Sequence, residues 1–252
     1  MPDKQDRTFR ATAVVLRHIE YGEADRILTL YTLEKGKIQA IAKGVRKIRS
    51  RKAGHLEPFT QVALFLAKGR NLAVVTQAEA LDSYPGIRAD LQRTALAAYV
   101  MELLDRFTQE EGENRQLFHL LVATLGRLNQ DEQPETIVRY YEVQLLDLLG
   151  FRPELTHCVV CRREIQPEDQ YFSAKLGGAL CPRCSAQDSS AWRISMPALK
   201  YLRYFQRSPY AVVRGRVIPA AAETELRALM ERYFTYLLEY SLRTPGFLDA
   251  IS

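Results

Sequence analysis

Long hydrophobic runs are missing from this sequence. No uninterrupted apolar stretch reaches the roughly 18 residues that a membrane-spanning helix needs. The first ten residues, MPDKQDRTFR, also lack the apolar stretch of a secretory signal. With 47% hydrophobic and 26% charged residues in a chain of 252, the composition is that of a folded globular protein. We therefore expect a soluble protein that works in the cytoplasm.

The motifs of the common enzyme families are missing as well. The sequence has no G-x-x-x-x-G-K-[ST], no G-x-G-x-x-G after a strand, no G-x-S-x-G and no H-E-x-x-H. Three histidines, His18, His55 and His119, lie far apart and have no partner pattern around them. The acidic residues between positions 20 and 25 are typical of a turn between two strands. We therefore expect a protein without catalytic activity.

Cysteine is scarce, and its placement points to a metal. The four cysteines form two C-x-x-C pairs separated by nineteen residues, a spacing typical of four-cysteine zinc sites. Each C-x-x-C turn brings two thiolates to one ion, and two such turns complete a tetrahedron. Between the pairs, Gly177-Gly178 predicts a hairpin that returns the chain so that the second pair meets the first. The predicted ligands of one structural zinc ion per chain are Cys158, Cys161, Cys181 and Cys184.

Other uses of these cysteines are less favourable. Four thiolates leave no open coordination position for water or substrate, so a catalytic zinc is disfavoured. A redox pair would be accompanied by a thioredoxin-like βαβ pattern, which the sequence does not show. His157 precedes the first cysteine and offers an alternative ligand, but four thiols already suffice.

Acidic residues are absent from one strongly basic stretch. The formal net charge is +5, yet residues 35–52 hold eight Lys or Arg and no Asp or Glu. The rest of the chain is slightly acidic, so the positive field is local and suited to a polyanion. A solvated loop without a ligand is the alternative. The predicted nucleic-acid contacts are Lys35, Lys37, Lys43, Arg46, Lys47, Arg49, Arg51 and Lys52.

Base stacking would require exposed aromatic side chains near that stretch. Tyr21, Tyr31 and Phe59 are the nearest ones, although packing in the core or at its rim is the simpler assignment for each.

A second region without carboxylates spans residues 189–222. It would extend the nucleic-acid track, receive an acidic partner segment beside Tyr201, Tyr204 and Phe205, or pair with acids from elsewhere in the fold. The basic residues of this possible second site are Arg193, Lys200, Arg203, Arg207, Arg214 and Arg216.

The hydrophobic pattern predicts two kinds of structure along the chain. Five short segments rich in β-branched and aromatic residues, between residues 9 and 81, predict a small β-barrel. In the third segment, the alternation predicts that Ile38, Ala40 and Ala42 face the core and that Lys37, Gln39 and Lys43 face water. After Ser83-Tyr84-Pro85-Gly86 the period changes from two to about 3.6, which marks a domain boundary. We therefore expect an α+β protein with a barrel domain at 1–82 and a helical domain at 83–252. The helices are expected near 96–107, 117–128, 138–149, 196–207 and 226–237. Gly150 is expected to end the third of them as a left-handed residue.

The order of these features resembles the RecO family of bacterial DNA repair and recombination mediator proteins. The resemblance is carried by Tyr21-Gly22-Glu23-Ala24-Asp25-Arg26, Ala42-Lys43-Gly44-Val45-Arg46, Leu56-Glu57-Pro58-Phe59, Leu148-Leu149-Gly150-Phe151 and the two cysteine pairs. It covers essentially the whole chain. It implies that the barrel is an OB-fold and that a zinc module, at about 154–190, is inserted in the helical domain.

The resemblance also implies a function. Members of the family bind single- and double-stranded DNA, anneal complementary strands without nucleotide hydrolysis, and act with RecR to help RecA replace single-stranded-DNA-binding protein. A nucleoid-associated location in the cytoplasm follows from that role. Three alternatives stay open: an RNA-binding OB protein of the translation machinery, an adaptor that docks acidic protein tails, and a zinc hydrolase.

Overall fold

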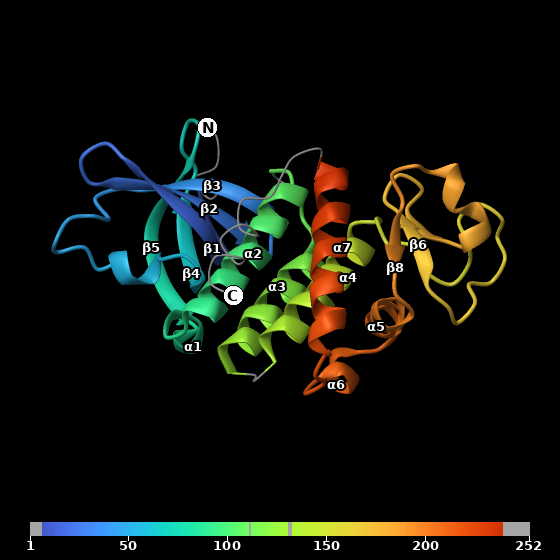
Figure 1. Ribbon diagram of the computed structural model, residues 1–252. Helices are drawn as coiled ribbons and strands as arrows, with labels where there is room; N and C mark the ends of the chain where they lie inside the picture. Colours follow the sequence, from blue (N-terminus) through green and yellow to red (C-terminus); the bar gives the residue numbers. More distant parts are fainter. Residues whose placement is uncertain (1–6, 111, 131–132, 239–252) are drawn as a thin grey trace. The chain divides into compact units, whose positions relative to one another are not determined.

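The computed structural model describes residues 7–110, 112–130 and 133–238 (Figure 1). The chain divides into two compact units, Met1–Gln130 and Asp131–Ser252. Within the described residues, no helix has the length and apolar character needed to cross a membrane.

The first unit contains a closed five-stranded barrel with the strand order β1-β2-β3-β5-β4. Its neighbours pair antiparallel except β3 and β5, which run parallel and pair only at Ala40–Ala73 and Ile41–Val74. This is the predicted OB-fold, a five-stranded Greek-key barrel. The strands are β1 (Thr8–Tyr21), β2 (Asp25–Thr32), β3 (Gly36–Ala42), β4 (Gln61–Ala67) and β5 (Ala73–Asp82).

Alternating side chains fill the barrel, as the period of two predicts. In β3, Ile38, Ala40 and Ala42 are buried in the barrel core, which confirms the predicted inward face. The prediction that Lys37 faces water is wrong. Its ammonium donates hydrogen bonds to the Asp105 carbonyl at 2.5 Å and to the Asp105 carboxylate at 3.1 Å, since a helix of the same unit covers this side of the strand.

Three helices complete the first unit: α1 (Pro85–Arg88), α2 (Leu91–Phe107) and α3 (Arg115–Gln130). Asp90 caps α2 by accepting a hydrogen bond from the Arg93 backbone N–H at 2.9 Å. The sequence pattern missed α1 because four residues are too few to show a helical period. The units group these helices with the barrel, and the predicted boundary between a barrel domain at 1–82 and a helical domain at 83–252 stays a prediction.

The second unit combines helices with a small sheet of order β7-β6-β8. The predicted hairpin around Gly177 is confirmed, since β6 and β7 pair antiparallel and Gly177 has a φ of +72°. β8 and α6 were not predicted. The elements are α4 (Pro134–Leu148), β6 (Gln170–Ser173), β7 (Gly178–Leu180), β8 (Trp192–Ile194), α5 (Met196–Arg207), α6 (Tyr210–Val213) and α7 (Ala220–Leu238).

Helix α4 ends where the sequence predicts it. Gly150 adopts a φ of +81°, and the Phe151 N–H donates to the Leu146 carbonyl at 2.8 Å. This left-handed residue closes the helix and favours glycine because a Cβ would be strained there. The predicted helices near 96–107, 117–128, 138–149, 196–207 and 226–237 are all present.

A buried ion pair in α4 gives the second unit a testable dependence on charge. Arg139 and Glu142 are 3% and 0% exposed and lie 2.8 Å apart, and Glu223 of α7 lies 3.4 Å from the same guanidinium. Replacing Arg139 with Met is expected to lower the free energy of unfolding by about 3–5 kcal/mol, because it leaves a buried carboxylate without its cation. Denaturant unfolding measures this loss.

The matched control is Arg152→Met, which removes the cation of an exposed pair with Asp147 at 3.2 Å. A loss of no more than about 1 kcal/mol is expected there. Acidification should partly restore the Arg139 variant, since a protonated Glu142 is neutral. Equal losses in the two variants would contradict the assignment.

Candidate nucleic-acid interface and metal centre

The basic stretch continues into a long loop, residues 43–60, which joins β3 to β4. Its start is fixed against the β1–β2 turn: the Gly44 N–H donates to Asp25 Oδ1 at 2.7 Å, and the Arg46 N–H donates to the Ala24 carbonyl at 2.9 Å. Further along, the Lys52 ammonium donates to the Val75 carbonyl of β5 at 3.0 Å. The most basic part of the loop is therefore held against the barrel at both ends.

Half of the predicted contacts are exposed cations without an acidic partner in the part of the chain that the structure describes. They lie at the start of the loop and at its tip, where Ile48 is also fully exposed. Cations in this state can approach phosphates without first breaking a protein ion pair. These four residues are Lys43, Lys47, Arg49 and Arg51.

The other four cations already have partners on the protein. Lys37 is 14% exposed and bound to Asp105. Arg46 lies 3.0 Å from Glu20, and Lys35 lies 5.1 Å from the centroid of the Phe9 ring. Lys52 is held by the Val75 carbonyl. The predicted cluster is thus divided, and Lys37 is the member least able to reach a phosphate.

The three aromatic residues near the loop differ in exposure. Tyr21, at the end of β1, is 54% exposed and follows the Glu20 that pairs with Arg46. Tyr31 is fully buried, and burial raises its pKa to about 12. Phe59 is half-buried and lies 5.7 Å from the Arg88 guanidinium. Of the three, Tyr21 is the side chain open to a base beside the basic loop.

Two basic residues of the second basic region, residues 189–222, are bound to other groups of the protein, which the sequence does not indicate. Arg193 pairs with Asp169 at 2.9 Å. Arg203 donates to the Leu155 carbonyl at 2.8 Å, and burial, followed by the nearby Arg207, lowers its pKa. Arg203 is therefore held within the second unit, whereas Arg193 is 73% exposed and its ion pair lies at the surface.

The remaining four residues of this region are exposed. Lys200, Arg207 and Arg216 have no acidic partner within the described ranges. Arg216 also borders a hollow of about 420 Å³ that Tyr201 and Tyr204 line. The fourth exposed residue is Arg214.

The four cysteines come together in the second unit. Their Sγ atoms all lie within 4.8 Å of one another, and Cys161 Sγ and Cys181 Sγ are 3.8 Å apart. A tetrahedral zinc with bonds of about 2.3 Å has sulfur–sulfur edges of about 3.8 Å. The cluster is therefore consistent with a closed structural metal site. Cys158 is buried, and the other three are partly or fully exposed.

Backbone donors favour the thiolate form that a metal requires. Burial raises the pKa of Cys158, but the N–H groups of Cys161, Cys181 and Val160 outweigh this effect and lower it to about 6. Desolvation and the neighbouring sulfur atoms raise the pKa of Cys184 to about 12. A metal that binds all four sulfurs must therefore displace protons. His157 is not part of the group, and its Nδ1 lies 3.2 Å from Thr156 Oγ1.

Several contacts fix the cysteine-bearing segment to helices α5 and α7. Gln206 donates to the Pro153 carbonyl at 2.9 Å, beside the Arg203 contact to Leu155. The Phe172 ring of β6 packs edge-on against Tyr233 of α7 with centroids 5.2 Å apart. The cysteine site is therefore coupled to the packing of the second unit.

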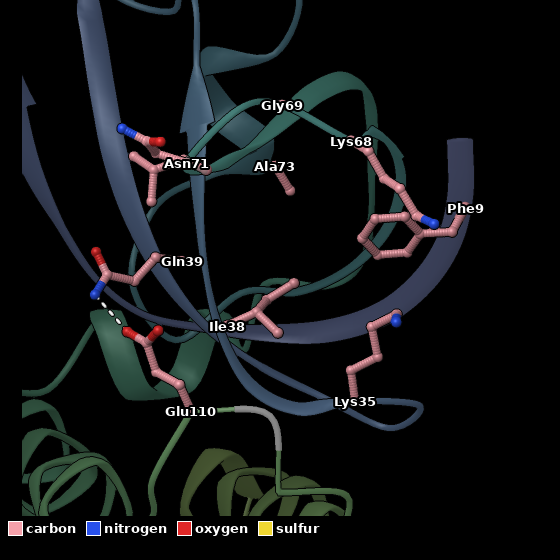
Figure 2. Close-up of a pocket in the computed structure, with 10 residues that line it drawn as sticks. Phe9, Lys35, Ile38, Gln39, Lys68, Gly69, Asn71, Ala73 and Glu110 are labelled. Atoms are coloured by element: carbon pink, nitrogen blue, oxygen red, sulfur yellow. Dashed lines mark hydrogen bonds between the residues drawn. The ribbon is translucent and has the colours of Figure 1, made fainter. Parts of the chain in front are cut away.

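Sequence reasoning missed one hollow of the first unit. A pocket of about 290 Å³ lies between the start of β3 and the loop that enters β5, with Phe9, Gln39 and Asn71 on its walls (Figure 2). These residues come from three separate segments and form no motif. The sequence carried no signal that would have brought them together.

Comparisons with known proteins agree on one family. The family models described as recombination protein O N terminal and recombination protein O C terminal match residues 7–84 and 88–245. A protein named DNA repair protein RecO from Roseiflexus sp. (strain RS-1) is 40% identical over 98% of this chain and 87% of its own length. A protein of the same name from Dehalococcoides mccartyi is 36% identical over 97% of this chain and 96% of its own length. Another, from Halalkalibacterium halodurans, is 32% identical over 96% of this chain and 94% of its own length.

Proposed function

Because this chain belongs to the RecO family of DNA repair proteins, we propose that it binds single- and double-stranded DNA through the OB barrel and its basic loop, and anneals complementary strands. The observation that carries the proposal is a set of exposed cations, Lys43, Lys47, Arg49 and Arg51, which have no acidic partner among the residues that the structure describes. Arginine and lysine bind phosphate oxygens, and arginine does so with two parallel hydrogen bonds.

Annealing needs only these contacts and no bond-making step by the protein. Cations of the loop neutralise phosphates and reduce the repulsion between two strands that approach each other. Tyr21, exposed beside the loop, offers a stacking surface to an unpaired base. Base pairing between the strands then supplies the free energy, so no nucleotide hydrolysis is required.

The cysteine site supports this role indirectly. The four sulfur atoms fit zinc in number, chemistry and separation, and the site is closed. When bound, zinc would supply folding stability and no reaction chemistry. We propose that the second unit, held together in this way, is a scaffold for protein partners, and that RecR is one of them in the replacement of single-stranded-DNA-binding protein by RecA.

Strand annealing tests the proposal directly. The protein is expected to speed the pairing of complementary DNA strands without ATP and to shift both single- and double-stranded DNA in gels. Each bound phosphate contributes about −0.7 to the slope of log affinity against log salt concentration for single-stranded DNA. With about four phosphates bound, the slope should therefore be roughly −3. Competition between DNA and RNA strands separates this function from the translation alternative. Tighter binding of RNA, or no acceleration of annealing, would refute the proposal.

The hollow beside Arg216 favours a second role, the docking of an acidic protein tail. Tyr201 and Tyr204 supply aromatic walls, and Lys200 and Arg207 add positive charge on the same helix. We expect the acidic tail peptide of single-stranded-DNA-binding protein to bind the chain in calorimetry, and Arg216→Glu to weaken it at least tenfold. Unchanged affinity in that variant would place the tail elsewhere.

A further inference from the structure

The pocket in Figure 2 has walls of contrasting chemistry. Gln39, Asn71 and Glu110 lie on one side, and Phe9, Lys35 and Lys68 lie on the other. Aliphatic side chains, Ile38 and Ala73 among them, lie between the two. All of these residues belong to the first unit.

The polar wall is suited to an uncharged group with hydrogen-bonding edges. Gln39 Nε2 donates to Glu110 Oε1 at 2.5 Å, which leaves the Gln39 carbonyl oxygen as an acceptor. Asn71 is exposed and offers both an acceptor and a donor. The Glu110 carboxylate would repel a phosphate placed on this side. An anionic group is therefore disfavoured here, and a neutral ring with amino and carbonyl groups is favoured.

The opposite wall is suited to an aromatic ring with a phosphate nearby in the same molecule. Phe9 is half-buried and packs against the barrel core, so its ring is held in place. The Lys35 ammonium lies 5.1 Å from the ring centroid. A phosphate joined to an incoming aromatic base through its sugar would attract this ammonium more strongly than the Phe9 ring does, since charge-assisted hydrogen bonds exceed exposed cation–π contacts.

The pocket also lies close to the basic loop. Ala73 lines the pocket and pairs with Ala40 across the β3–β5 seam. Lys52 of the loop is bonded to the Val75 carbonyl, two residues further along β5. Two residues of a strand span about 7 Å. A strand of nucleic acid held by the loop can therefore place a neighbouring nucleotide in the pocket.

We propose that this pocket binds one unstacked nucleobase of single-stranded DNA, with Phe9 as the stacking surface and Asn71 and Gln39 as partners of the base edge. The proposal rests on the DNA binding proposed above and deepens it, because it assigns a contact to the base rather than to the phosphate. The pocket has a volume of about 290 Å³, which is near the lower limit for small-molecule pockets and suits a single flat ring system.

The test compares two strands with the same number of phosphates, a short strand of cytidine nucleotides and a strand of abasic sites. The wild-type chain is expected to bind the cytidine strand about tenfold more tightly, the scale of one base stacked on an aromatic ring. In a Tyr21→Ala background, which removes the other stacking surface proposed above, Phe9→Leu, which keeps the core contact, and Asn71→Ala, on an exposed loop, should each remove most of the preference that remains. Their affinity for the abasic strand should stay that of the wild type.

The matched control is Phe65→Leu, an aromatic of β4 outside this pocket, which should keep the tenfold preference. If Phe9→Leu and Asn71→Ala keep the preference, the base pocket is overturned while DNA binding by the loop stands. If the wild-type chain binds neither strand, both proposals fail. Should Phe9→Leu unfold, Asn71→Ala alone decides the question, since it replaces an exposed side chain.

Discussion

Replacing Lys47, Arg49 and Arg51 together with glutamate is expected to lower the affinity for single-stranded DNA at least about 100-fold at about 0.1 M salt. Each phosphate contact contributes about 0.7 to the log–log salt slope, so three lost contacts remove about two logarithmic units at this concentration. Repulsion between the new carboxylates and the phosphates adds to the loss. The salt slope itself should become shallower by about 2. Fluorescence anisotropy with a labelled strand, repeated across salt concentrations, measures both quantities.

A second triple variant controls for net charge. Lys200→Glu, Arg207→Glu and Arg216→Glu change the formal charge by the same amount but lie on the other compact unit. The loop variant should retain the wild-type unfolding temperature, because its three side chains are exposed and have no acidic partner among the described residues. An equal loss of DNA affinity in both variants would show that overall charge, not the loop, governs binding. A loop variant with unchanged affinity would refute the interface.

Removal of the metal is expected to unfold the cysteine-bearing segment of the second unit. Structural zinc sites contribute on the order of 10 kcal/mol in small peptides, and that binding energy is folding energy. Cys158→Ser removes the buried ligand, so we expect loss of about one zinc per chain and a fall of several kcal/mol in unfolding free energy. Metal analysis gives the stoichiometry, and hydrogen exchange should show lost protection over residues 154–190.

The loss of protection from hydrogen exchange should begin in the cysteine-bearing segment and should then reach helices α5 and α7, which contact it. The contacts of Arg203 to Leu155 and of Tyr233 to Phe172 tie the segment to α5 and α7, so these helices should also lose protection. His157→Ala is the matched control and should keep the zinc, because His157 lies outside the sulfur group. A metal-free chain with full protection over residues 154–190 would contradict a structural role for the metal.

The elements that depend on local pattern were predictable from the sequence. The period of two in β3 placed Ile38, Ala40 and Ala42 in the barrel core, and the spacing of the cysteines predicted that their sulfur atoms meet. Gly150 predicted the end of α4, because a left-handed residue there favours glycine. In each case the information lies within a few residues, or in a ligand set with strict geometry.

Which basic side chains are bound to other groups of the protein was not predictable in this way. Lys37 looks like a surface residue of an alternating strand, yet its partner Asp105 is 68 residues away in the sequence. Arg203 looks like part of a basic helix face, yet it caps a carbonyl 48 residues earlier. An ion pair depends on which elements pack together, and a charge count along the chain does not contain that information.

By itself the sequence determined the barrel, the five longer helices, the pairing of the four cysteines and the location of the basic loop, because periodicity, ligand spacing and unopposed charge are local properties. Only the tertiary structure decided which cations remain available and brought Phe9, Gln39 and Asn71 to one pocket. Those outcomes depend on contacts between distant segments, since burial and pairing are set by the packing of whole elements against one another.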